Sequence, residues 1–193
     1  MSIFDSVFKQ AGNGIANAVN KAVTNKTVPV SFPALPNNLA ELMRLPGSDL
    51  TDPYAVAAFL VAALNVYPTN REACFEMLNY LKGPRPLTPY DQQFIRDRFM
   101  DGTNYVPRSY FNGSSPDNDY TPTTPYTINV MELVHSRDQF NEGYLKLFMR
   151  SSGADNERYL VLRHKPSTNQ WFVWEFAGIL VGIRQPKSSD PWA

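Results

Sequence analysis

The chain has 193 residues, and its 18 lysines and arginines balance 18 aspartates and glutamates. This length suits one domain with an appendage, and such a chain buries roughly 70% of its unfolded surface without disulfides or metals. A balanced charge supplies no overall field for nucleic acid or an anionic membrane, so nucleic-acid binding is disfavoured. A single cysteine, Cys74, excludes an internal disulfide framework. No secretory signal pattern and no apolar run of about 18 residues is present, so we expect a cytoplasmic protein of the bacterial type.

Residues 1–26 carry an apolar stripe with the period of a helix, and polar side chains, several of them asparagine, lie on the opposite side. Gly12 and Gly14 each cost about 1 kcal/mol against alanine, so this helix is marginal alone and forms best against another surface. We predict an amphipathic contact element here. The residues expected to face a partner are Phe4, Val7, Phe8, Ile15 and Val19.

Three surfaces compete for this predicted helix: a protein partner or second copy, the protein's own domain, and a membrane. Protein pairing needs no charge, because an apolar helix face fits an apolar groove. Anionic lipid has only Lys9, Lys21 and Lys26 in its favour, at about 1 kcal/mol each, and Asp5 acts against it. We expect an unidentified protein partner or self-association through residues 1–26, and a membrane surface is the less favoured alternative.

The first half of the chain predicts a linker, a short helix and three strong helices. Residues 27–37 hold three prolines and indicate an extended linker, which a short helix around 38–45 follows. The segment after residue 52 is almost wholly apolar, which predicts a helix buried on most sides. N-caps are predicted at Asp52 (or Thr51), Asn70 and Thr88, and terminating glycines at Gly83 and Gly102.

The second half changes to the period of strands. Strand-length apolar or alternating segments occur at 126–133, 143–152, 158–166 and 170–176, and 178–183 is a strand or a short helix. This order predicts an α+β fold, with helices on one face of an antiparallel sheet of about four to five strands. We divide the chain into a leader, residues 1–30, and a single domain, residues 31–193. The sheet face under the helices is expected to carry Leu145, Leu147, Met149, Leu160, Leu162, Phe172 and Trp174.

Residues 105–130 combine five aromatic side chains with several prolines in a segment that cannot be one helix. Prolines lower the entropy of an ordered irregular path, and tyrosines cover apolar surface while their hydroxyls find partners. Ordered long loops also line ligand sites in many proteins. The segment is therefore interpreted first as a packed cover and second as the lining of a ligand site.

Several long sequence words stand out: LKGPRPL, DRFMDG, SSGADNER and DPWA, together with the 105–130 segment. On these words the chain resembles an uncharacterised bacterial family known as a domain of unknown function, DUF6935, from about Ser31 to Ala193. Where members of that family tend to have SGGADSPR, this chain has SSGADNER, so Gly153, Ala154, Asp155 and Arg158 match and the flanks differ. The resemblance implies no activity, substrate, cofactor or catalytic residue.

Catalytic signatures are missing from the sequence. There is no G-x-S-x-G elbow, no Walker A loop and no dinucleotide fingerprint, and the two histidines have no metal-ligand spacing. We expect no catalytic residue, no metal site and no cofactor, and the preferred function is a non-catalytic interaction or accessory module that contacts its partner through the leader.

The alternative is a small-ligand-binding domain or a hydrolytic enzyme with a cleft between the 105–130 segment and the sheet. A concave pocket with convergent polar groups would support it. The residues expected to bind the ligand are Tyr105, Tyr110, Arg150, Asp155, Arg158 and Arg163.

Overall fold

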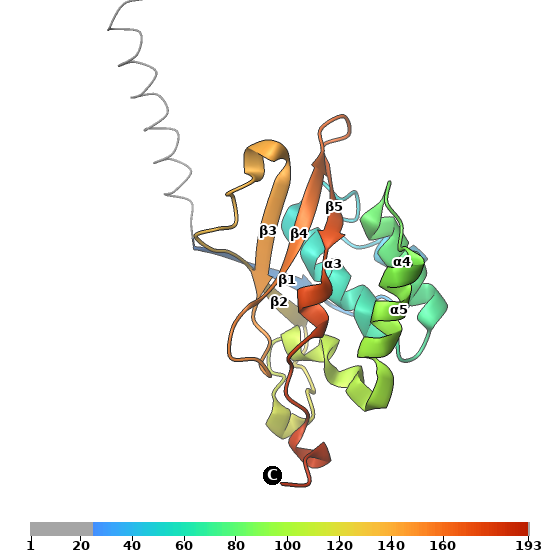
Figure 1. Cartoon of the computed structure of the whole chain (residues 1–193), viewed down its shortest axis with the longest axis vertical. Coiled ribbons are helices and arrows are strands. Elements are labelled where there is room, and N and C mark those ends of the chain that lie inside the picture. The colour runs from blue at the N-terminus through green and yellow to red at the C-terminus, as the bar shows by residue number, and fades with distance from the viewer. Residues whose placement is uncertain (1–24, 193) are drawn as a thin grey trace, which may run out of the picture.

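A five-stranded antiparallel sheet organises the structure (Figure 1). The computed structural model describes residues 25–192. The strands are β1 (Lys26–Phe32), β2 (Tyr126–Glu132), β3 (Tyr144–Met149), β4 (Arg158–Lys165) and β5 (Gln170–Glu175). They lie in the order β1-β2-β3-β4-β5, and each strand is antiparallel to its neighbours. The predicted α+β class is confirmed, and so is the number of strands.

The chain between β1 and β2 contains the described α-helices: α2 (Leu39–Leu42), α3 (Pro53–Val66), α4 (Arg71–Lys82) and α5 (Pro89–Arg98). The predicted N-caps of the long helices are confirmed, because a side-chain oxygen accepts a first-turn N–H at Asp52, Asn70 and Thr88. The last helix ends earlier than predicted. A 3-10 helix from Met100 to Tyr105 replaces the final turn expected before Gly102.

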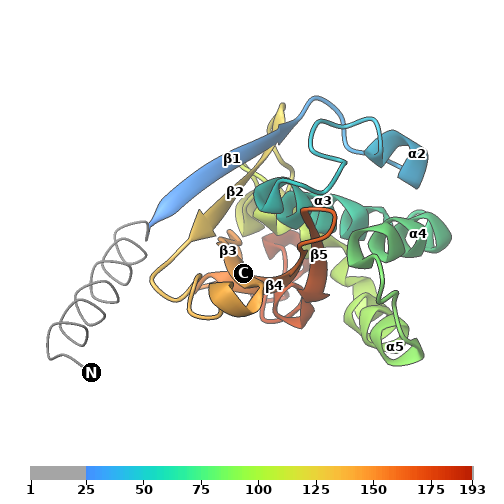
Figure 2. The same ribbon diagram turned by 90° about the horizontal axis from the view of Figure 1, so that it is seen from above.

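Helix α3 is the centre of the core. It lies between the sheet and α4, with α5 farther from the sheet (Figure 2). Because neighbours cover it on several sides, 12 of its 14 residues are buried, in line with its almost wholly apolar sequence. Side chains of Leu145, Leu147, Met149, Leu160 and Leu162 are at most 1% exposed and form the sheet side of this core. The face predicted to lie under the helices is confirmed for β3 and β4.

The predicted linker at residues 27–37 is wrong, because most of it is strand β1. Val28 and Val30 are partly buried against the core, and Phe32 is buried and packs on the ring of Phe59 at 6.0 Å between centroids. Pro29 obscured this alternation in the sequence, but a proline is tolerated in an edge strand, where its missing N–H leaves no ladder bond unmade. The sheet thus begins at Lys26, ahead of the predicted domain start.

The side of β5 that was predicted to lie under the helices is wrong. Trp171 and Val173 are buried in the core, whereas Phe172 is half-buried and Trp174 is 39% exposed. The pairing of Leu162 with Val173, next to a register shift at Val161, sets this side. Large apolar residues occupy both alternating sets of this strand, so alternation alone did not decide between them.

The 105–130 segment is a packed cover, as predicted. It contains the short 3-10 helices Pro107–Tyr110 and Pro116–Asn118, and three of its rings are at most 3% exposed. The hydroxyl of Tyr110 donates to the carbonyl of Ile179 at 2.7 Å, and that of Tyr120 donates to the carbonyl of Arg184 at 2.6 Å. The segment therefore ties the sheet to the C-terminal part of the chain.

Candidate functional site

A cleft lies between the 105–130 segment and the sheet, at the place where the alternative function requires one. Its volume is about 330 Å³. We call it the Arg150 cleft, and its lining is Ser109, Tyr110, Phe111, Asn112, Gly113, Ser114, Asn129, Arg150 and Ser152. Of the six residues predicted to bind a ligand, Tyr110 and Arg150 are brought together here.

Backbone contacts hold the loop wall of this cleft. Phe111 forms an isolated bridge with Ile128 of β2, and the N–H of Asn112 donates to the carbonyl of Thr127 at 2.8 Å. Gly113 has a φ of +80°, and a Cβ at this position would lie 2.4 Å from the side chain of Thr123. The positive φ and the close contact with Thr123 both require glycine at position 113, so the backbone of this wall is already fixed in the absence of a ligand.

Buried serine hydroxyls support the wall from below. Ser151 Oγ donates to Ser109 Oγ at 2.7 Å, and Ser109 Oγ donates to the carbonyl of Val106 at 2.7 Å. Ser114 Oγ donates to the carbonyl of Phe111 at 2.6 Å. These hydroxyl protons are already committed, and the cleft lining contains no carboxylate, imidazole or thiol that would act as a general base. The serines hold the loop in place and are not arranged as nucleophiles.

The groups left for a ligand are a guanidinium and two amides. Arg150 is exposed and has no hydrogen bond or ion pair with any residue that the structure describes. Asn129 Nδ2 donates to Asn112 Oδ1 at 3.0 Å, which leaves the Nδ2 of Asn112 and the Oδ1 of Asn129 to other partners. A fork of guanidinium donors beside an amide donor matches the oxygens of a carboxylate.

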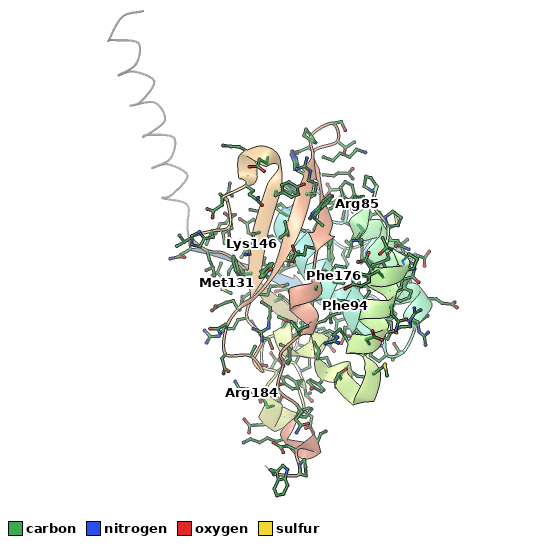
Figure 3. All side chains as sticks on the ribbon, in the orientation of Figure 1. Arg85, Phe94, Met131, Lys146, Phe176 and Arg184 are labelled. Atoms are coloured by element: carbon green, nitrogen blue, oxygen red, sulfur yellow. The ribbon has the colours of Figure 1, made fainter. Side chains whose placement is uncertain are left out.

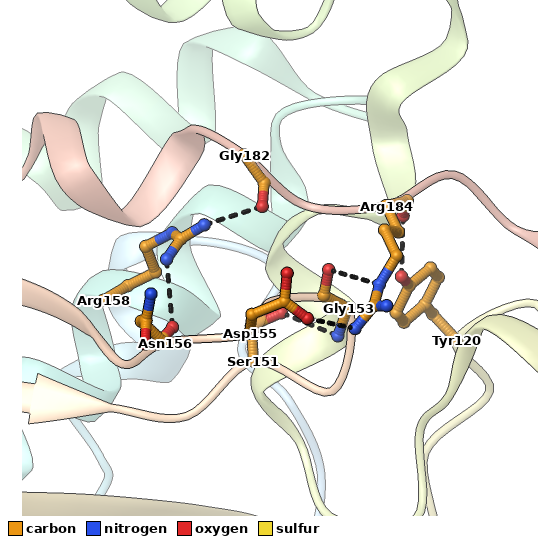
Figure 4. Close-up of polar contacts among 8 residues, drawn as sticks. All are labelled: Tyr120, Ser151, Gly153, Asp155, Asn156, Arg158, Gly182 and Arg184. Carbon is orange, nitrogen blue, oxygen red and sulfur yellow. Dashed lines mark hydrogen bonds and ion pairs between the residues drawn. The ribbon is translucent and has the colours of Figure 1, made fainter.

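Asp155 and Arg158 lie outside the cleft and hold the C-terminal segment (Figure 4). Arg158 donates to the carbonyls of Val181 at 2.9 Å and Gly182 at 2.7 Å. Asp155 Oδ1 accepts a hydrogen bond from Arg184 Nη2 at 3.1 Å. The family-like GAD turn is thus a structural anchor, in which Gly153 leaves space for the hydroxyl of Tyr120.

The remaining predicted residues are also engaged elsewhere. Tyr105 is half-buried and stacks on Tyr120, with ring centroids 5.2 Å apart. Arg163 lies over the ring of Tyr144 at 4.2 Å and donates to the carbonyl of Glu142. The predicted partner residues Phe4, Val7, Phe8, Ile15 and Val19 lie outside the described residues, and their role stays a prediction.

Sequence reasoning missed the asparagines and serines of the cleft. Asn129 stands on the half-buried side of β2, and alternation along that strand is a signal that locates it. Asn112, Ser109 and Ser152 carry no comparable signal, because they come from loops whose approach depends on tertiary packing.

A buried ion pair at the other end of β2 was missed as well. Glu132 is 1% exposed, and its carboxylate accepts hydrogen bonds from Arg137, one of them at 2.8 Å, and from the hydroxyl of Tyr54. Burial alone would raise the pKa of Glu132, but the bonds from Arg137 and Tyr54 outweigh it and hold the pKa below its usual value. Burial and the neighbouring carboxylate raise the pKa of the Tyr54 phenol. This cluster joins α3, β2 and the following loop, and both carboxylate oxygens of Glu132 accept hydrogen bonds within it.

The fold defines an α+β domain with one helix-covered sheet face, and among the described residues the lining of its cleft places no carboxylate, imidazole or thiol beside the serines. Residues 34–187 match a family model described as a domain of unknown function (DUF6935), so the chain belongs to this family. Neither the comparison with curated proteins nor that with solved structures gave a match. Across residues 25–192, no helix is long and apolar enough to cross a membrane, and no three His, Cys, Asp or Glu side chains converge on a metal position.

Proposed function

We propose that this protein is a non-catalytic binding module that takes a small carboxylate in the Arg150 cleft. The observation that carries the proposal is the guanidinium of Arg150, which has no partner among residues 25–192, beside two amides in a cleft whose lining has no acidic residue. A carboxylate placed there gains charge-assisted hydrogen bonds without meeting a like charge. The hydrolytic alternative is disfavoured, because the serines of the lining have no base beside them.

The size of the cleft restricts the ligand. About 330 Å³ is at the small end of ligand sites, which run from about 300 to 1,000 Å³. Tyr110 and Phe111 turn most of their surface inward, but the accessible part of the lining is still more carbon than nitrogen or oxygen, with the guanidinium and the amides as its polar groups. The volume and this mixed lining favour a compact acid with a short apolar body, of the size of an amino acid or a short dicarboxylate.

The test is a titration with succinate and glutamate, followed in amide ¹H–¹⁵N spectra. We expect the side-chain NH₂ signals of Asn112 and Asn129 to shift with succinate and not with its neutral analogue succinamide. Arg150→Gln should weaken binding by about tenfold or more, since a charged hydrogen bond is lost. Arg71→Gln, an exposed arginine at the start of α4, is the matched control and should bind like the wild type. Equal shifts with succinamide, or an Arg150→Gln variant that binds normally, would overturn the proposal.

A second function rests on the leader: contact with a protein partner or a second copy through the apolar stripe of residues 1–26. The strand β1 begins at Lys26, so the stripe is joined to the sheet without the long linker that the prolines had suggested. A contact made by the stripe is therefore coupled directly to the domain.

This function is tested by comparing the full chain with residues 25–193, a cut that preserves β1. We expect the full chain to show a concentration-dependent mass in light scattering and the shorter chain to remain monomeric. The paired changes Phe4→Gln and Phe8→Gln should abolish the association, whereas Asn13→Gln with Asn17→Gln on the polar side should leave it intact. A full chain that stays monomeric at all concentrations and captures no protein from lysate would remove this function.

A further inference from the structure

A second hollow lies at the edge of the sheet, and its lining shares no residue with the Arg150 cleft. It opens between β5 and the loop that joins α4 to α5, and its volume is about 290 Å³. We call it the Trp174 pocket, and its lining is Lys82, Pro84, Arg85, Arg163, His164, Lys165, Pro166, Phe172, Val173 and Trp174. Arg85 marks its position beside the helices (Figure 3).

The floor of the Trp174 pocket is apolar and rigid. Trp174, Phe172 and Val173 supply it, together with two prolines. Gly83 has a φ of +56°, and a Cβ there would lie 2.3 Å from the ring of Phe172. The loop backbone therefore lies directly on the Phe172 ring. Such close packing fixes the shape of the pocket, while Trp174 stays 39% exposed at its mouth.

A lysine whose side chain is mostly buried forms one wall. Lys82 is 8% exposed, and its Nζ has no hydrogen bond to any described residue. Its nearest carboxylate oxygen, Asp91 Oδ2, is 3.8 Å away and already accepts the N–H of Thr88 at 2.9 Å. Burial lowers the pKa of Lys82, and Asp91 offsets this only in part. An anion in the pocket would give Nζ a closer charged hydrogen-bond partner than Asp91 provides.

The rim repeats the positive charge. Arg85 lies over the ring of Trp174 at 4.0 Å, and Arg163 and Lys165 complete the set. No aspartate or glutamate lines the pocket, although the whole chain has equal numbers of acidic and basic residues. The guanidinium of Arg85 covers one face of the Trp174 ring, and its own outer side is a flat surface against which a ligand ring can stack.

We propose that the Trp174 pocket binds an aromatic monocarboxylate of one or two rings, with the ring on Trp174 and Phe172 and the carboxylate at Lys82 and Arg85. The apolar floor takes the ring, and the cationic wall takes the single negative charge. The volume of about 290 Å³ accommodates one or two rings. The site is separate from the Arg150 cleft, because the two linings share no residue.

The probe for this site is 2-naphthoate, compared with the neutral 2-naphthalenemethanol, by fluorescence titration and amide ¹H–¹⁵N spectra. We expect the acid to bind about tenfold or more tightly than the alcohol, since a charged hydrogen bond distinguishes them. The indole N–H signal of Trp174 should shift, while the side-chain signals of Asn112 and Asn129 in the other cleft should not.

Two variants separate binding from folding. Lys82→Met removes the charge from the wall at similar length and should remove the preference for the acid. Arg85→Gln changes an exposed side chain and should weaken naphthoate binding even where Lys82→Met is unstable. Arg71→Gln, at the opposite end of α4 and also near a ring, is the matched control. Equal binding of acid and alcohol to the wild type, or naphthoate binding that Arg85→Gln leaves unchanged, would overturn the proposal.

Discussion

The two faces of the sheet differ in how they are stabilised. The face toward α3 is almost wholly aliphatic, and its leucines are at most 1% exposed. The opposite face pairs cations with rings: Lys146 lies 3.9 Å from the ring centre of Tyr159, and Arg163 lies 4.2 Å from that of Tyr144. Lys146 and Met131 can be seen on this side, away from the helices (Figure 3). Burial of apolar side chains thus stabilises the fold on the face toward α3. The opposite face carries exposed charged and aromatic groups, which lower the stability of the protein little.

The first prediction concerns Glu132, a buried carboxylate on the helix-covered side of the sheet. Replacing Glu132 with glutamine leaves the guanidinium of Arg137 without its carboxylate, and breaking a buried pair in this way costs about 3–5 kcal/mol. Urea unfolding should show this loss in the free energy of unfolding. Glu142→Gln is the control, because that side chain is exposed. A loss below that of the control would mean that the buried pair contributes nothing.

The same residue predicts how stability depends on pH. Because the folded state holds the pKa of Glu132 below its usual value of about 4.3, its contribution is complete above that pH and is lost as the pH falls toward the folded pKa. Wild-type protein should therefore lose stability on acidification more steeply than Glu132→Gln. The pKa of Glu41, lowered mainly by the backbone N–H of Asn37, gives the same background slope in both proteins. Parallel acid unfolding curves would contradict the prediction.

A neighbouring pair on β4 compares the two faces directly. Leu160→Ala opens a cavity in the core and should cost about 2–5 kcal/mol. Tyr159→Ala removes a half-buried ring from the opposite face and should cost less than half as much, since solvent already reaches it. Thermal and urea unfolding of the two variants measure the difference. Equal costs would show that the outer face is as tightly packed as the core.

The smallest effect is expected for the cation on the outer face. Lys146→Gln removes the contact with the rings of Tyr159 and Phe148, and exposed contacts of this kind contribute about 0.5–1 kcal/mol. Unfolding at low and high salt should show a loss within this range. Lys165→Gln is a suitable control, since that exposed lysine has no ring contact among the described residues. A cost above 2 kcal/mol would contradict the view that this face contributes little to stability.

The parts of the fold that depend on local signals were predictable. Polar N-caps, an apolar helix and alternating strands identified α3, α4, β3 and β4, because each signal lies within a few residues. The prediction from sequence failed for β1 and β5, where two local signals conflict. Pro29 hid β1, and rings on both sides of β5 hid its orientation.

The candidate sites were harder to predict than the elements. The structure brings two of the six predicted residues, Tyr110 and Arg150, into one cleft, and Asn112, Asn129 and Ser152 reach it only through tertiary packing. Lys82 looks in the sequence like an ordinary basic residue in the last turn of a helix. The side chain of Lys82 is buried by the loop that follows it and by the edge of β5. The pattern of apolar residues along α4 predicts neither of these contacts.

The position of β1 has a consequence for the order of assembly. Strands β2 to β5 pair with sequence neighbours, whereas pairing Lys26 with Glu132 and Phe32 with Tyr126 closes a loop that contains α2 to α5. Closing so long a loop costs entropy that later contacts must offset, so β1 is expected to pair with β2 late in folding. Amide hydrogen exchange should be faster in β1 than in β3 and β4. Because the leader is attached to β1, force or binding at residues 1–24 reaches the sheet through the seven residue pairs of β1 with β2, and β2 in turn pairs with β3 at only two positions.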